Sequence, residues 1–285
     1  MTALVGRVDH PVIAVHDLEL TSQKFKKLGF VVPPSGKHKE WGTENLCIMF
    51  PKDYLEIRGI GDPSKFLAGV DKFLAGGEGL YSVAFNAKSA EASYREGIAT
   101  GIAIEPPKHL NRKLIVDGQT LDLHFKTVML GHEFYPGLNH ANLCEHLTAD
   151  TLRQPGWLDH PNGVISFGRL VGVVSDFDQA ERVYKHLLGA ENVRREGHRI
   201  LLNFGEGADI ELIDADEAAR RGDAQPQRGE SYLASATLLV KDLAATEDLF
   251  INNGVTFQRK GDALAVAAAE ACGARLYFKQ ATIAS

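Results

Sequence analysis

Two strand-like segments of this chain each carry one ionisable side chain among apolar neighbours: His10 in VDHPVIAV and Glu56 in YLEI. An imidazole nitrogen and a carboxylate oxygen are ligands that Zn, Mn, Fe or Ni accept in proteins. The run NLCEHLT adds Glu145 and His146, and side-chain alternation places only one of them on a given face of a strand. The sequence therefore predicts a divalent-metal site of His10, Glu56 and one of this pair, His146 or Glu145. The member of the pair that is not a ligand is a candidate general base.

Both principal candidates also have a structural interpretation. A buried carboxylate without a partner is costly, so Glu56 requires a metal, a substrate, or an ion pair with a cation such as Arg58 or Arg112. A histidine at the start of a strand can hydrogen-bond to a neighbouring strand, which is the alternative role for His10. The sequence leaves these alternatives open.

The segment HKEWGTEN gathers groups that could contact a substrate. It places an imidazole, an indole and an amide at His38, Trp41 and Asn45 within one turn region. Gly, Thr and Asn are also common in turns for conformational reasons alone. The combination of directional hydrogen-bonding groups with one flat aromatic face favours substrate binding by these three residues.

The elements that must position these residues follow a pattern that appears four times. Each copy has an apolar strand, an acidic or Ser residue that starts a helix, a Gly that ends it, and then short strands separated by turns. The pairs of helix-starting residue and Gly are Asp17 and Gly29, Ser89 and Gly101, Asp176 and Gly189, and Asp242 and Gly254. The repeating unit is therefore βαβββ.

One such unit cannot bury both its helix and its sheet, so the units are expected to pair. The predicted fold is α+β, with four units paired into two curved mixed sheets that carry helices outside. The predicted domains are 1–160, with the active site, and 161–285, a degenerate structural copy, divided near the turn residues of HPNG. Residues 105–140 are expected to form an inserted loop or lid over the site.

The same position in the first strand of each unit carries His10, Ser82, Arg169 and Ser235. In the third unit, Glu211 lies in IELI as Glu56 lies in YLEI, and an ion pair between Glu211 and Arg169 is expected there. This difference between the halves is why the active site is expected in the first one.

Composition excludes several classes of function. The 285 residues carry a formal net charge of -6 without a basic stripe, so binding to nucleic acid or to an anionic membrane is not expected. The 3 cysteines are an odd number without close spacing, which favours a reducing, cytoplasmic setting, and no signal peptide or membrane span is predicted. The expected partner is a small-molecule substrate, and association into a homodimer through the sheet edges stays open.

The paired βαβββ units, with a His on the first strand and a Glu on the last, resemble the vicinal oxygen chelate superfamily. Within it the chain is similar to glyoxalase-like proteins, on VDHPVIAVHDL, HKEWGTENLCIMF, YLEIRGI, CEHLT and HPNG. The resemblance implies an enzyme that acts on a small oxygenated metabolite by metal-assisted isomerase, lyase or ring-cleavage (dioxygenase) chemistry. Metal-using members generally have a ligand at the position that is Ser82 here. The alternative function is metal-free binding of a small planar ligand.

Overall fold

The computed structural model describes residues 4–116, 118–130 and 135–282. The chain folds as four βαβββ units, as predicted. The long helices α1, α3, α5 and α7 start at the predicted residues. The N-cap side chains of these four helices accept hydrogen bonds from backbone amides of the first turn, which have no partner inside the helix: Asp17, Ser89, Asp176 and Asp242.

The four units supply most of the regular elements of the fold. The first unit contains β1 (Val8–Ala14), α1 (Leu18–Lys27), β2 (Gly36–His38), β3 (Thr43–Met49) and β4 (Tyr54–Ile60). The second contains β5 (Gly79–Asn86), α3 (Ala90–Thr100), β6 (Lys108–Val116), β7 (Gln119–Met129) and β8 (His140–His146). The third contains β9 (Val164–Val173), α5 (Phe177–Leu188), β10 (Val193–Arg195), β11 (Arg199–Leu202) and β12 (Asp209–Ile213). The fourth contains β13 (Tyr232–Val240), α7 (Leu243–Asn252), β14 (Phe257–Lys260), β15 (Ala263–Val266) and β16 (Leu276–Gln280).

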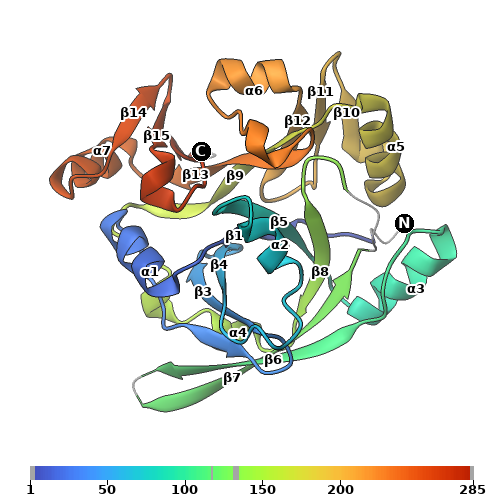
Figure 1. Ribbon diagram of the computed structural model, residues 1–285, viewed down its shortest axis with the longest axis horizontal. Coiled ribbons are helices and arrows are strands. Elements are labelled where there is room, and N and C mark those ends of the chain that lie inside the picture. The colour runs from blue at the N-terminus through green and yellow to red at the C-terminus, as the bar shows by residue number, and fades with distance from the viewer. Residues whose placement is uncertain (1–3, 117, 131–134, 283–285) are drawn as a thin grey trace.

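The strands of the first two units form a closed barrel in the order β1-β4-β3-β2-β6-β7-β8-β5. Closure requires the pairing of β2 with β6, in which His38 lies opposite Arg112. The hairpin strands β6 and β7 have 9 and 11 residues, whereas their counterparts β14 and β15 have 4 each. The prediction of a loop or lid over residues 105–140 is therefore wrong, because much of this segment is a long hairpin that closes the barrel (Figure 1).

The strands of the last two units form an eight-stranded sheet in the order β10-β11-β12-β9-β13-β16-β15-β14. The antiparallel pair β9 and β13 lies at its centre, and β10 and β14 lie at its two edges. Figure 1 shows this sheet beside the barrel, with α1 and α3 on the outside of the barrel. One hydrophobic core is shared by the two sheets; it includes Val8 and Phe85 from the barrel, with Phe167 and Phe278 from the second sheet.

Two short helices pack against residues of the barrel's inner face at opposite ends. Val70 and Leu74 of α2 (Val70–Leu74) pack with Val12 and Ala14 of β1. Leu152 of α4 (Ala149–Leu152) packs in a cluster with Cys47, Met49, Tyr54, Leu114 and Leu123. Strands β1 and β4 are parallel, with Val12 opposite Glu56 and Ala14 opposite Arg58. Tyr54 comes two residues before Glu56, so it lies toward the opposite end of the barrel from Ala14. A cavity lies between these two apolar clusters.

The remaining short helix α6 (Ala215–Arg221) follows β12 in the second half. Across the described part of the chain, every helix is too short or too polar to cross a bilayer.

Candidate functional site

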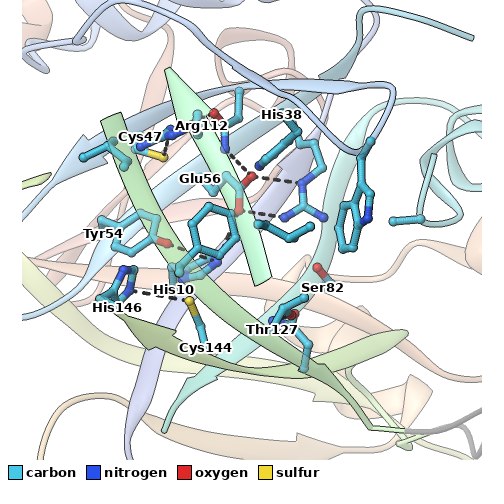
Figure 2. Close-up of a pocket in the computed structure, with 18 of the residues that line it drawn as sticks. His10, His38, Cys47, Tyr54, Glu56, Ser82, Arg112, Thr127, Cys144 and His146 are labelled. Carbon is cyan, nitrogen blue, oxygen red and sulfur yellow. Dashed lines mark hydrogen bonds and ion pairs between the residues drawn. The ribbon is translucent and has the colours of Figure 1, made fainter. Parts of the chain in front are cut away.

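The barrel encloses a cavity of about 50 Å³ that is lined by both polar and apolar side chains, which is room for a few water molecules. Its lining includes six of the seven residues that the sequence proposes for the site: His10, His38, Trp41, Asn45, Glu56 and His146. Figure 2 shows His10, His38, Glu56 and His146 converging from several strands, together with the labelled neighbours Tyr54, Ser82, Arg112 and Thr127. The closed barrel thus brings together side chains that lie far apart in the sequence.

Glu145, the seventh candidate, does not reach the cavity. Its Oε2 accepts a hydrogen bond from the backbone amide of Ala90, in the first turn of α3 on the outside of the barrel. Alternation along β8 therefore directs His146 inward and Glu145 outward. The sequence could not decide between the two, and the structure gives Glu145 a role in satisfying a helix terminus.

Glu56 lies in an ion pair with Arg58, two residues along the same strand. Arg58 Nε and Nη2 donate to Glu56 Oε1 and Oε2 at 2.9 and 2.8 Å, and Asn45 Nδ2 donates to Oε1 at 2.7 Å. Burial opposes ionisation, but Arg58 and His10 hold the pKa of Glu56 well below its usual value. The ion-pair alternative for Glu56 is therefore the arrangement found, with Arg58 as the cation.

His10 lies between two carboxylates. Its Nδ1 is 2.8 Å from Asp9 Oδ2 and its Nε2 is 3.2 Å from Glu56 Oε2. Burial lowers the pKa of His10, but the hydrogen bonds to these two acids outweigh it and raise the pKa. Tyr54 stacks on the imidazole, with ring centroids 4.1 Å apart. His10 is thus held in one orientation on three sides.

Asp9 is fully buried, and sequence reasoning missed it. The pairing of β1 with β5 shifts register between Val8 and His10, which is the signature of a β-bulge. Asp9 Oδ2 lies 2.8 Å from His146 Nε2 as well as from His10 Nδ1, so one carboxylate oxygen joins two imidazoles. Burial lowers the pKa of His146, but its interactions with Cys144 and Asp9 outweigh burial and raise that pKa to about 10.

The polar contacts form a continuous path through the barrel. Arg112 Nη1 donates to Asn45 Oδ1 at 2.7 Å, and Asn45 then connects to Glu56. From Glu56 the path runs through His10 and Asp9 to His146, and His146 Nε2 lies 3.7 Å from Cys144 Sγ. Asn45, predicted to bind substrate, uses both ends of its amide in this path.

His38 differs from His10 and His146, which also line the cavity. Burial lowers its pKa to about 4, and Arg58 and Arg112 add to the effect, so the ring is neutral at pH 7. Its Nδ1 lies 3.1 Å from the carbonyl oxygen of Thr43, which can only accept a hydrogen bond, and 2.9 Å from the Thr43 hydroxyl, which can also accept one. Nδ1 therefore carries the proton, and Nε2 has a free lone pair. Trp41 packs beside the ring, with centroids 6.0 Å apart.

Arg112 is a buried cation without a carboxylate partner among the described residues. Its Nη1 donates to Asn45 and to Cys47 Sγ, the latter at 2.9 Å. Burial raises the pKa of the Cys47 thiol to about 11, so this neighbour is uncharged at pH 7. The register of β2 and β6 places Arg112 beside His38.

The second half of the chain also has a buried glutamate that pairs with arginine, as Glu56 pairs with Arg58 in the first half. Glu211 lies 3.3, 2.6 and 3.0 Å from nitrogens of Arg169, Arg199 and Arg221. The expected ion pair with Arg169 is present. This carboxylate is surrounded by cations, and no histidine is placed beside it within the described residues.

A family profile described as a glyoxalase-like domain matches residues 8–188. Similar solved structures include a hypothetical protein from Staphylococcus aureus (TM-score 0.68, 11% identity, covering 96% of this chain and 99% of that one). A variant of 4-hydroxymandelate synthase from Streptomyces coelicolor gives a TM-score of 0.60 at 12% identity, covering 97% of this chain and 92% of that one. A xylose isomerase-like TIM barrel/4-hydroxyphenylpyruvate dioxygenase fusion protein gives 0.57 at 14% identity, covering 99% of this chain and 50% of the fusion. A search of curated protein sequences finds no match.

The chain belongs to the glyoxalase-like domain family. Its paired βαβββ units place it in the vicinal oxygen chelate superfamily, as the sequence resemblance predicts. Membership of this superfamily implies a divalent metal, for which the position between His10 and Glu56 is the expected site.

The residues at that position do not fit a cation. Both oxygens of Glu56 are already engaged by a guanidinium. Ser82 and Asn142, which take the positions of His10 and Glu56 in the second unit, offer only neutral oxygens and an amide. Among the described residues, one group of three brings its ligand atoms within 4.8 Å of one another, and it consists of Asp9, Cys144 and His146. The predicted set of His10, Glu56 and His146 is not assembled around one point, because His146 is directed at Asp9.

Proposed function

We propose that this protein is an enzyme that binds a small oxygenated carboxylate in the barrel cavity and moves a proton on it, as an isomerase or lyase does. The observation that carries the proposal is the pairing of a neutral imidazole, His38, with a buried cation, Arg112, on adjacent strands at the cavity. The enclosed cavity and the perturbed pKa values around it are typical of active sites.

The charge balance of the cavity favours an anionic ligand. The carboxylates of Asp9 and Glu56 are offset by His146 and Arg58, respectively. Arg112 is left over, and a buried cation without a counter-ion is costly. A substrate carboxylate bound by the guanidinium removes that cost and fixes the substrate's orientation.

The proton acceptor in this proposal is His38 Nε2. It takes a proton from the carbon next to the substrate carbonyl, the C–H electron pair moves to the carbonyl oxygen as an enolate, and the cationic wall of the cavity stabilises that charge. In a substrate with a hydroxyl on that first carbon, the hydroxyl proton moves to the former carbonyl oxygen and His38 returns its proton to the former carbonyl carbon, which completes an isomerisation in which no oxidant is consumed. Since Arg58 and Arg112 help to lower the pKa of His38, a bound carboxylate offsets them and makes His38 a stronger base.

The remaining residues keep supporting roles in this scheme. Trp41 supplies a flat apolar wall, and Asn45 holds Arg112 in place rather than contacting the substrate. Ring cleavage with O₂, the other predicted reaction, needs a redox metal, and no step of this scheme requires one.

The second candidate function is binding without turnover. It is favoured because His10 already contacts both Asp9 and Glu56 through its two ring nitrogens. Deuterium exchange in D₂O, followed by proton NMR, distinguishes the two functions. The first probe is pyruvate, a small 2-oxo acid. The second is 4-hydroxyphenylpyruvate, a larger 2-oxo acid that the name of the similar fusion protein contains. Calorimetric titration measures their binding.

An enzyme exchanges the C3 protons of a bound acid for deuterium faster than buffer does. His38→Asn abolishes that exchange while binding persists, and Arg112→Gln weakens binding by about 10- to 100-fold, as expected for a lost charged hydrogen bond. The control variants are His16→Asn and Arg259→Gln, whose side chains are exposed on the surface. Binding without exchange supports the second candidate, and no binding of either acid overturns both.

A further inference from the structure

The end of the barrel near α4 holds three side chains of the kinds that bind transition metals. Asp9, Cys144 and His146 each offer one ligand atom, and these atoms lie within 4.8 Å of one another. Cys144 and His146 come from β8, two residues apart on the same face, and Asp9 comes from the bulge of β1. The position is distinct from the contact between His10 and Glu56, where both carboxylate oxygens already accept hydrogen bonds from Arg58.

The distances between these atoms suit a small tetrahedral ion. Cys144 Sγ lies 3.7 Å from His146 Nε2. Typical Zn–S and Zn–N bonds place such a pair about 3.6 Å apart. Asp9 Oδ2 lies 2.8 Å from His146 Nε2, where a shared ion requires about 3.4 Å, so a side-chain movement of roughly 0.6 Å is needed.

An independent observation points to a missing partner at the same place. Asp9 Oδ1 is buried and has no hydrogen-bond partner among the described residues. Buried carboxylate oxygens are almost always satisfied, and an unpaired one calls for an ion or a water molecule. Oδ2, the oxygen that faces His146, also bonds to His10 Nδ1, a contact of the kind that orients the carboxylate ligands of metals.

We propose that Asp9, Cys144 and His146 form a metal site for a borderline-soft divalent cation such as Zn²⁺ or Co²⁺. Thiolate and imidazole ligands select such ions over Mg²⁺ and Ca²⁺, which take oxygen ligands. Cys144 and His146 line the cavity, whereas Asp9 lies behind them, so the coordination position left open by three ligands faces the cavity. Three protein ligands and one open position are the arrangement of catalytic zinc sites.

The inference goes beyond the proposed function, because ion binding is measured with no substrate present. Chelator-treated, reduced protein is titrated with CoCl₂, and the spectrum reports the ligands directly. A thiolate ligand gives a sulfur-to-cobalt charge-transfer band in the near ultraviolet, and tetrahedral Co²⁺ gives visible bands. The wild-type protein is expected to show both at one equivalent.

Cys144→Ser is expected to remove the charge-transfer band and to weaken Co²⁺ binding by about 100-fold. Cys272→Ser is the matched control, because Cys272 is also buried with a hydrogen-bonding neighbour, Thr21, but lies in the second half of the chain. It is expected to keep the full spectrum. We expect two further variants, His146→Asn and Asp9→Asn, to weaken Co²⁺ binding. The Co²⁺ that still binds should keep the charge-transfer band, because Cys144 is unchanged in both.

The proposal is overturned if wild-type protein shows no cobalt–thiolate band, or if Cys144→Ser retains it. Thermal unfolding of each variant, followed by circular dichroism, establishes that it is folded. If Cys144→Ser does not fold, the band is measured in a Cys47→Ser and Cys272→Ser double variant. Cys144 is then the remaining cysteine, so a lost band overturns the proposal and a retained band supports it.

Discussion

The carboxylate of Asp53, between β3 and β4, accepts a hydrogen bond from the backbone amide of Phe167 on β9, at 3.2 Å. This contact joins the barrel to the second sheet inside the protein, since Asp53 is 2% exposed. Burial raises the pKa of Asp53 to about 7 despite that hydrogen bond, and its Oδ1 has no partner in the described part of the chain.

Asp53 is therefore expected to make stability fall as pH rises. Between about pH 4 and pH 7 the folded state holds a proton on this carboxyl that the unfolded state has lost, so the free energy of unfolding decreases through that window. The full loss is roughly 4 kcal/mol for a shift of that size. Asp53→Asn should show a smaller loss between pH 5 and pH 8 than the wild type, measured by urea unfolding. The exposed Asp216→Asn should follow the wild type, and equal losses in all three proteins would contradict the prediction.

Replacing Glu56 should destabilise the barrel strongly. Glu56→Gln leaves Arg58 buried without its counter-charge, which typically costs about 3 to 5 kcal/mol. The control is Glu44→Gln, which removes an ion pair with Lys37, a side chain that is 76% exposed, and should cost about 0 to 1 kcal/mol. Urea unfolding of the two variants checks the difference. Similar costs for both would show that the buried pair does not matter to the fold.

His160 is expected to support the junction between the halves in its neutral form. Its Nδ1 accepts from the amide of Val31 at 3.0 Å, and its Nε2 donates to the carbonyl of Met49 at 2.9 Å. Burial lowers the pKa of His160, so its contribution is complete above about pH 6.5 and is lost as pH falls through the folded-state pKa. His160→Ala should cost about 1 to 3 kcal/mol at pH 8 because two buried backbone groups lose their partner.

The advantage of wild-type protein over His160→Ala should then shrink in acid. His16→Ala, which changes an exposed side chain, is the control and should be neutral at both pH values. A constant difference between wild type and His160→Ala from pH 8 to pH 5 would disprove the role of the neutral ring.

A methyl group at Gly172 should disturb the packing of β9. A Cβ there would lie 2.5 Å from the carbonyl oxygen of Gly137, and backbone has to move to relieve that contact. Gly172→Ala is therefore expected to lower the free energy of unfolding by about 1 to 3 kcal/mol. At Gly156 an added Cβ meets open space, so Gly156→Ala should change stability much less. Calorimetric melting of the two variants provides the comparison.

Local rules explain why much of the fold could be predicted. Helix starts at residues such as Asp17 and Asp176 follow from side-chain capping, which depends on a few neighbouring residues. Barrel closure depends on the length of β6 and β7, whereas the charged, Pro- and Gly-containing sequence around that hairpin predicts a loop. Pairing between distant strands leaves no local signal of this kind.

The site was predictable only in part for the same reason. Arg58 could be anticipated, because residues two apart on a strand share a face, and it was one of the alternatives considered for Glu56. Asp9 was not predictable, because a bulge changes which face a side chain occupies without an evident sequence pattern. The role of Glu145 at the start of α3 depends on a contact 55 residues away in sequence.

The pairing of β2 with β6 also decides how small molecules travel to and from the cavity. A ring of hydrogen-bonded strands has no side opening, so traffic must pass one of the ends, where α2 and α4 pack. A ligand is therefore expected to enter and leave past the short helices α2 or α4, and not between separating strands. The second sheet ends in two unjoined strands, so anything bound to its face would not have to pass through a barrel end.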